Sequence, residues 1–489
     1  MKRFIIAGAY LMVCAVALLL STPADARVQG QPGKDWGNPA GKECAECHMK
    51  ENFGLWQEWN ASQHGQNGIN CLDCHQAQKN DPDAFTHKGQ LISILVTPKD
   101  CARCHPTEVK EQQRSHHATA GQILNSLDNL LGEVIGGPAA VVVGCRQCHG
   151  GKVEIDAKGR PTMDTWPNTG IGRINPDGSW GSCAACHGRH TFSRAQARTP
   201  DTCGKCHIGP DHPQLEVYNE SKHGILYRAQ TETDPSKLNL HSDKWVAGVD
   251  NPIAPTCSTC HMSEAQGLAK THDVGERISW NLRSPVSNKI NLVRLDNGKS
   301  FDVPEGKPVP KVGSQARGAK VIEVLTWENR REMMETVCYA CHGEKFVTGH
   351  YKQLDDFVEL YNEKFAKPVK AIMGELKKMG KITPSPFDDK IEWIWWEIWH
   401  HEGRVARHGA AMMGPDYAWW HGLYEVAQHT YFKFIPELEH IVGKEEAKRL
   451  VKKHFTHPGH DWYFNGMNKD ALKKIKAEYE KRYGKGSVQ

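Results

Sequence analysis

The sequence predicts a mainly α-helical fold, with a few short hairpins and a region of long helices toward the C-terminus. Three observations support this class. Eight Cys-x-x-Cys-His motifs lie between residues 44 and 342, and most are too close together for separate aliphatic cores. Glycine, proline and charged residues are frequent between the motifs, which is typical of short helices joined by loops. After residue 343, apolar residues recur at helical spacing.

The N-terminal segment has the three parts of a secretory signal. The basic start Met1-Lys2-Arg3 precedes an apolar run from Phe4 to about Leu20, and Ala24-Asp25-Ala26 forms an A-x-A cleavage site. We expect residues 1–26 to be a signal peptide that is cleaved near Ala26 on export to the periplasm. An uncleaved membrane anchor is the alternative, because the apolar run approaches the length of a bilayer span.

The eight motifs use every cysteine outside this signal, which itself contains Cys14. Two thiols and the next imidazole at this spacing are the attachment site of a c-type haem, in which the thiols bond the vinyl groups and the histidine binds the iron. A structural zinc site would need four ligands, and a thioredoxin-like pair has no use for the histidine. The sequence therefore predicts eight covalently bound c-type haems, on Cys44/Cys47/His48, Cys71/Cys74/His75, Cys101/Cys104/His105, Cys145/Cys148/His149, Cys183/Cys186/His187, Cys203/Cys206/His207, Cys257/Cys260/His261 and Cys338/Cys341/His342.

The motif spacing divides the mature chain into two regions. Residues 27–342 are the octahaem-binding region, in which we expect the porphyrins to fill much of the interior, with a long insertion at about 273–337. Short hairpins are expected at 153–160, where Lys158-Gly159 forms the turn, and at 290–303, where Asp296-Asn297-Gly298 does.

Residues 343–489 form a helical C-terminal region. Helices are predicted at 351–379, about 390–411, about 419–441 and 470–483, with Pro384 and Pro386 ending the first. Tryptophans cluster here, and we expect them to pack against haems and neighbouring helices or to contact another subunit. Long helices outside a haem core are also a natural oligomerisation surface.

The charge balance argues against nucleic-acid binding. The formal charge is +4, and removal of Lys2, Arg3 and Asp25 with the signal leaves +3. Since each haem adds two propionates, the holoprotein should be acidic overall.

A haem that only transfers electrons usually has a second protein ligand on its iron, whereas a haem that reacts with substrate leaves that coordination position open. Histidines outside the motifs offer seven ligand positions for eight haems, which indicates one open haem. Two of the positions are ambiguous, and there His117 and His408 are the first choices. The candidates are His64, His87, His116 or His117, His190, His223, His272, and His401 or His408.

The order of the motifs resembles the octahaem hydroxylamine oxidoreductase family, which includes reductive nitrite and hydroxylamine reductases. The resemblance runs from about Cys44 to Tyr431 and is most specific in four segments. It implies that the fourth haem, on Cys145, Cys148 and His149, is catalytic, with Asp211 and His212 as the acid/base pair. Reactions of small inorganic nitrogen compounds move protons together with electrons, so a titrating imidazole and a carboxylate suit such a site. The segments are Cys183-Ala-Ala-Cys-His187-Gly-Arg-His190, Cys203-Gly-Lys-Cys-His207-Ile-Gly-Pro-Asp211-His212, Ser221-Lys-His223-Gly and Thr271-His272.

The direction of the reaction depends on a tyrosine. In the family, oxidative members carry a tyrosine from a neighbouring subunit that is covalently joined to the catalytic haem, and reductive members lack this link. Tyr417 is the candidate here, but an ungapped count from His408 to Trp420 places Asp416 in the linking register. The sequence also ends at Gln489 without the C-terminal membrane helix of some oxidative members.

These observations favour reduction of nitrite or hydroxylamine to ammonium. Oxidation of hydroxylamine or hydrazine is the first alternative, and a cytochrome that only transfers electrons is the second. The resemblance implies a homo-oligomer, by analogy a trimer. The expected redox partner is another cytochrome or a quinol-linked membrane protein.

Overall fold

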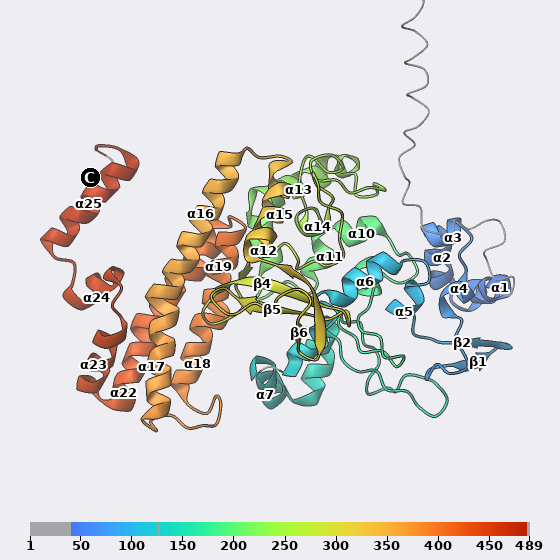
Figure 1. The fold of residues 1–489 in the computed structure, drawn as a ribbon, viewed down its shortest axis with the longest axis horizontal. Helices are drawn as coiled ribbons and strands as arrows, with labels where there is room; N and C mark the ends of the chain where they lie inside the picture. The colour runs from blue at the N-terminus through green and yellow to red at the C-terminus, as the bar shows by residue number, and fades with distance from the viewer. Residues whose placement is uncertain (1–40, 126, 487–489) are drawn as a thin grey trace, which may run out of the picture.

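The computed structural model describes residues 41–125 and 127–486 (Figure 1). The expected signal peptide and Ala26 lie outside these residues. Helices dominate, which confirms the mainly α-helical class, and the strands form only small sheets. Within the described part of the chain, no helix combines the length and the hydropathy needed to cross a bilayer.

Short helices dominate the chain up to residue 262, and several begin at the first cysteine of a motif. One helical turn places the two cysteines and the histidine on neighbouring positions of one face, as attachment to a single haem requires. The helices are α1 (Gly41–Glu51), α2 (Phe53–Ala61), α3 (Gln63–Gln66), α4 (Cys71–His75), α5 (Pro98–Cys101), α6 (Pro106–Arg114), η1 (Ala120–Asn125), α7 (Leu127–Val143), α8 (Cys145–His149), α9 (Ala184–His187), α10 (Arg194–Arg198), α11 (Pro200–Gly204), α12 (Gln214–Glu220), α13 (Lys222–Thr233), η2 (Pro235–Leu238) and α14 (Cys257–Met262).

Local capping explains where these short helices start. At α4 the Asn70 side chain accepts a hydrogen bond from the Leu72 N–H at 3.0 Å, and the Asp73 carboxylate accepts one from the Asn70 N–H at 2.7 Å. This reciprocal pair satisfies donors that the helix itself leaves open. The predicted 153–160 hairpin is only an isolated bridge, Ile155 with Pro161, closed by a turn at Gly159 with φ +75°. A two-stranded sheet that was not predicted joins β1 (Phe85–His87) to β2 (Gln90–Ile92).

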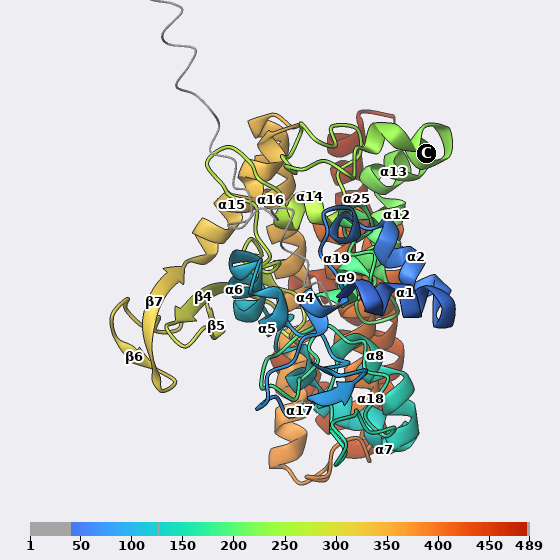
Figure 2. The same ribbon diagram turned by 90° about the vertical axis from the view of Figure 1, so that its right-hand side faces the viewer.

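The insertion forms a small antiparallel sheet. Its strands are β3 (Trp280–Asn281), β4 (Asn288–Leu295), β5 (Ser300–Pro304), β6 (Gln315–Ala316) and β7 (Ala319–Leu325). Strand β4 pairs with β3, β5 and β7, and β6 pairs with β7. The predicted 290–303 hairpin is confirmed as β4 and β5, with a turn at Gly298 whose φ is +78°. Figure 2 shows the β6–β7 end of the sheet projecting from the helical body.

The C-terminal helices are confirmed near their predicted positions, and each long one contains π-helical turns that the sequence pattern did not reveal. The first runs through α16 (Glu344–Tyr361), π-helical η3 (Asn362–Ala366) and α17 (Lys367–Lys378), after α15 (Trp327–Tyr339). The second runs through α18 (Lys390–Trp396), π-helical η4 (Glu397–Glu402) and α19 (Gly403–Ala411). The rest are α20 (Pro415–Ala418), π-helical η5 (Trp419–Tyr424), α21 (Glu425–His429), π-helical η6 (Thr430–Phe434), α22 (Ile435–Val442), α23 (Lys444–His454), η7 (Pro458–His460), α24 (Asp461–Asn465) and α25 (Lys469–Tyr483).

The largest apolar core lies among these helices. Its fully buried members include Val369, Ile372 and Leu376 of α17 and Phe434 and Leu438 from later in the chain. The predicted packing of the tryptophans holds only in part, because Trp399 is buried whereas Trp419 and Trp420 are about half exposed.

Shortening a side chain in this core should destabilise the C-terminal region. Leu376 is completely buried, so we expect Leu376→Ala to cost about 2–5 kcal/mol. Leu472→Ala in the exposed helix α25 is the matched control and should change stability by less than about 0.5 kcal/mol. Urea unfolding followed by far-ultraviolet circular dichroism measures both. Equal midpoints for the two variants would contradict this core assignment.

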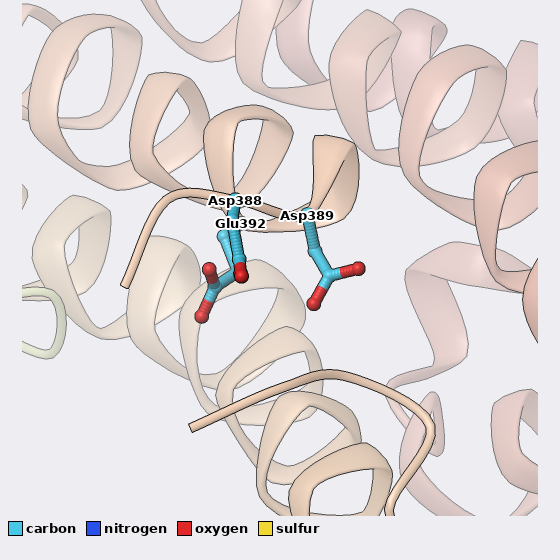
Figure 3. A group of neighbouring side chains, drawn as sticks. All are labelled: Asp388, Asp389 and Glu392. Atoms are coloured by element: carbon cyan, nitrogen blue, oxygen red, sulfur yellow. The ribbon is translucent and has the colours of Figure 1, made fainter. Parts of the chain in front are cut away.

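Three carboxylates gather where α18 begins (Figure 3). Asp388 accepts a hydrogen bond from the Thr383 hydroxyl, Asp389 accepts the Thr383 N–H at 2.9 Å, and Glu392 accepts the Phe387 N–H at 2.7 Å. Lys377 lies 3.6 Å from Glu392. These contacts show that the group holds the turn that precedes α18, and its negative charges are favoured by the positive end of the helix dipole.

Candidate haem sites and active site

Four of the motif histidines are oriented by hydrogen bonds from their Nδ1 atoms. His75 donates to the Ser93 carbonyl at 2.8 Å, and His149 donates to the Ala120 carbonyl at 3.3 Å. Similar bonds join His261 to the Val274 carbonyl at 3.2 Å and His48 to the Asn52 side-chain oxygen at 2.8 Å. A proton fixed on Nδ1 leaves Nε2 free to bind iron, which is the usual arrangement of a metal-bound histidine.

Five motif histidines face a second histidine ring. An iron bound by two imidazoles at about 2 Å holds the ring centres roughly 6 Å apart. The observed separations fit this geometry, so the donor set suits six-coordinate haem. The pairs are His48 with His87 at 6.3 Å, His105 with His64 at 6.2 Å, His187 with His272 at 6.5 Å, His207 with His117 at 6.1 Å and His342 with His223 at 6.0 Å.

The other three motif histidines differ from these five. His190, the candidate partner of His75, is close enough for their charges to interact. Among the described residues, no second histidine ring pairs at the same spacing with His149 or with His261. Within residues 41–125 and 127–486, the fourth and seventh sites therefore show no two-imidazole geometry.

The structure chooses between the candidates at one of the two ambiguous positions. His117 pairs with His207, whereas His116 lies 3.1 Å from Asp302 of β5 and is held there. At the other ambiguous position, His408 stays a prediction: its Nε2 lies 3.2 Å from the Gln214 side-chain nitrogen and it is close enough to His207 for their charges to interact. The alternative, His401, packs against Trp396 and does not face a motif histidine in the described chain.

Neighbouring thiols reveal the order of the attachment sites. Cys101 lies against Cys183, Cys148 against Cys206, and Cys203 against Cys257, each pair within hydrogen-bonding contact. Four further pairs are close enough for their charges to interact, namely Cys44 with Cys71, Cys74 with Cys104, Cys186 with Cys203 and Cys260 with Cys338. The sites therefore follow the order first, second, third, fifth, sixth, seventh and eighth, and the fourth branches from the sixth.

Two of the predicted attachment cysteines, Cys47 and Cys341, are exposed, whereas the other motif cysteines are partly buried. Cys47 belongs to the first site and Cys341 to the eighth, which are the two ends of the order of sites, although Cys44 and Cys338 of the same sites are partly buried. Attachment needs a thiol that reaches a vinyl group rather than a buried one, so both cysteines remain predicted haem ligands.

Asp211 and His212 lie together beside the fourth site. The His212 Nδ1 donates to the Asp211 carboxylate, and Nε2 donates to the Cys206 carbonyl at 2.8 Å. Their charges reach His149, and the His212 ring centre is 6.3 Å from that of His207. The structure thus brings the predicted acid/base pair to the one haem site that branches from the chain of the others.

The two groups shift each other's pKa. Burial alone would raise the pKa of Asp211, but the hydrogen bond from His212 and the charges of His212, His400 and Arg404 lower it to about 2. Burial alone would lower the pKa of His212, but the bond to Asp211 and its charge raise it above the usual value. Both shifts favour a carboxylate beside an imidazolium, and both ring nitrogens face acceptors.

Tyr417 lies apart from this pair within the chain. Its N–H is 3.4 Å from Glu220 of α12, and its ring centre is 6.0 Å from that of His421. Burial, together with the charges of Glu216, Glu220 and Asp416, raises the pKa of the phenol. His400 and Arg404, which do contact Asp211, were not predicted, because nothing in their sequence surroundings marks them as site residues.

Comparisons with known proteins agree with this arrangement. Residues 177–296 match the family described as "Seven times multi-haem cytochrome CxxCH". A probable nitrite reductase-hydroxylamine oxidoreductase fusion protein of Kuenenia stuttgartiensis is 24% identical over 355 residues, which is 65% of this chain and 35% of that protein. The chain therefore spans about a third of the length of this curated relative.

Two solved structures share the fold. One, described as a hypothetical multiheme protein, has a TM-score of 0.67 and 24% identity, covering 85% of this chain and 96% of the other. The other is a reducing HAO-like protein complex of Kuenenia stuttgartiensis, with a TM-score of 0.55 and 20% identity, covering 85% and 86%. HAO denotes hydroxylamine oxidoreductase, so the predicted resemblance is confirmed at the level of the fold.

Proposed function

We propose that this multihaem c-type cytochrome is an oxidoreductase that reduces nitrite or hydroxylamine to ammonium at its fourth haem. All eight motifs carry haem, and the other haems supply electrons through the sixth site. The observation that carries the proposal is the Asp211–His212 pair beside His149, which has no ring partner in the described chain. A cytochrome that only transfers electrons has no need of such a pair.

Bound haem would supply an iron that holds the substrate nitrogen and passes electrons to it. The protein supplies the protons. In its protonated form, His212 carries a proton on each ring nitrogen. The Nε2 proton can pass to the substrate oxygen when Nε2 turns away from the Cys206 carbonyl. Asp211 keeps the ring oriented and stabilises its positive charge. Reduction of hydroxylamine in this way uses two electrons and two protons, breaks the N–O bond and releases ammonia and water.

The reductive direction is supported by the register at Asp416 and by the likeness to a complex described as reducing. Oxidation remains the alternative because Tyr417 is partly exposed, as a tyrosine that reaches a neighbouring subunit must be. Mass spectrometry of the denatured protein distinguishes them. We expect single polypeptides carrying eight haems, and two polypeptides joined through one haem would overturn the reductive direction.

An open iron is required by this function. Adding carbon monoxide to the reduced protein, or nitrite to the oxidised protein, should change the absorption spectrum of a minority of the haems. An unchanged spectrum with both ligands would contradict the enzymatic proposal and favour electron transfer alone.

The second-ligand assignments make a separate prediction. His223→Ala should convert the eighth haem from a low-spin to a high-spin iron, because it removes the ring that faces His342. Electron paramagnetic resonance measures the change, and His241→Ala at an exposed position is the control. An unaltered spectrum for the first variant would rule out His223 as a ligand.

Export and assembly belong to the same proposal. Cleavage near Ala26 would deliver the chain to the periplasm, where another cytochrome or a quinol-linked membrane protein would supply electrons. The exposed Trp419 and Trp420 beside Tyr417 favour a homo-oligomer, by analogy a trimer. N-terminal sequencing and analytical ultracentrifugation of the purified protein test these two points.

A further inference from the structure

Four polar side chains join the two halves of the chain at the proposed active site. Asp211 and His212 lie in the loop before α12, and His400 and Arg404 lie in η4 and at the start of α19. Helices α12 and α19 contact each other and lie side by side in Figure 1. Side chains almost two hundred residues apart in the sequence therefore meet at one carboxylate.

Each oxygen of Asp211 has its own partners. Oδ1 accepts the hydrogen bond from His212, whereas Oδ2 lies 3.5 Å from Nη1 of Arg404 and 4.0 Å from Nε2 of His400. Nη1 of Arg404 also donates to Nε2 of His400 at 3.0 Å. A carboxylate held on both oxygens cannot rotate without losing a charge-assisted contact. The contacts of Arg404 and His400 with Oδ2 therefore also fix the position of Oδ1, to which His212 bonds.

Arg404 is itself held in place. Its Nε donates to the Arg283 carbonyl at 2.8 Å, and its guanidinium lies 5.0 Å from the centre of the Trp399 ring. The side chains of Arg404 and His400 are only 12% and 8% exposed. A buried guanidinium needs such partners to offset the loss of water, and its planar fork gives them a defined geometry.

We propose that Arg404 and His400 are positioning residues that hold Asp211, and through it His212, beside the residues that would bind the fourth haem. The inference rests on the proposed function of the Asp211–His212 pair and extends it to the C-terminal region. The acid/base pair is supplied by the haem-binding region, but its orientation is set by η4 and α19. The active site is therefore complete only when both regions are packed together.

Carbon monoxide bound to the reduced fourth haem provides the test, because its C–O stretching frequency responds to charge and hydrogen bonding at the distal side. Arg404→Gln should shift or broaden this infrared band and lower kcat for hydroxylamine by roughly 10²-fold, with KM nearly unchanged. Arg404→Lys, which keeps the charge but not the fork, should fall between this variant and the wild type. Arg194→Gln removes a surface ion pair with Asp243 at 2.7 Å and should change neither quantity.

A wild-type band and a wild-type kcat in Arg404→Gln would overturn the proposal. If Arg404→Gln loses haem or helix content, the same two measurements are made on His400→Asn. We expect an altered infrared band in that variant, and an unaltered band would contradict the inference. The band remains informative even if neither nitrogen compound is turned over. If the proposed function is wrong, the wild-type protein will not turn over nitrite or hydroxylamine. If the positioning role is wrong, the variants will keep the wild-type infrared band of bound carbon monoxide.

Discussion

Replacing His212 by alanine is expected to lower the turnover of nitrite or hydroxylamine by roughly 10²–10⁴-fold, which is the usual contribution of a positioned acid/base group. The reason is its place beside the fourth haem site, where its charge reaches His149. Steady-state reduction with a chemical electron donor measures turnover, and ammonium is determined as the product. His212 is no member of a motif, so haem attachment should be intact.

Two controls make this result interpretable. The mass of the variant and its pyridine haemochrome spectrum should show the wild-type number of haems, and His241→Ala at an exposed position should retain full turnover. Full turnover in His212→Ala would show that the protons reach the substrate by another route.

Replacing Asp211 by asparagine should have the second large effect, a loss of roughly 10²–10⁴-fold at neutral pH, as for other carboxylates that orient a catalytic histidine. Asparagine keeps the shape of the side chain but loses the charge that raises the pKa of His212. If His212 acts as the acid, activity requires its protonated form and falls as the pH rises through its pKa. The variant should therefore lose activity at a lower pH than the wild type does.

A pH–rate profile of kcat/KM from pH 5 to 9 measures the shift. Asp243→Asn, which removes the surface partner of Arg194, is the matched control and should leave the profile in place. If kcat/KM of Asp211→Asn falls at the same pH as in the wild type, or at a higher pH, His212 is not the acid that Asp211 supports.

The haem-binding residues were accessible to sequence reasoning because attachment is local. Two thiols and an imidazole within five residues need only one helical turn, so the spacing itself identifies them. Second ligands depend on the tertiary fold, so the sequence could not distinguish His116 from His117. In the structure His116 faces Asp302, whereas His117 faces His207. The role of His408 depends on the fold in the same way, since a buried histidine that contacts Gln214 has the same sequence signature as a ligand.

The exposure of the attachment sites also depends on the tertiary fold. Cys47 and Cys341 are exposed, although they have the same motif as the partly buried cysteines. The motif specifies which atoms bond the haem, but it carries no information about how much of the chain lies over them.

Other features were missed because local signals were weak or misleading. Helix α7 contains Gly137 and Pro138, which usually end a helix, and Gly137 indeed has φ +69° within it. Strand β7 alternates buried and exposed residues only at its beginning, so its pattern is short. Arg404 sits on an amphipathic helix, where an arginine is normally a solvated charge. Only its contact with Asp211 distinguishes it.

The π-helical turn η4 limits which changes of chain length this helix can accept. A π turn contains one more residue per hydrogen-bonded turn than an α-helix. The π turn Glu397–Glu402 has absorbed this extra residue, so deleting one residue there would restore regular α-helical bonding and leave α19 close to its present orientation. Deleting one residue from the regular helix α18 would instead rotate α19 by about 100° and turn Arg404 away from Asp211. Changes of chain length in the regular part of this helix are therefore constrained by the chemistry of a loop almost two hundred residues earlier in the chain.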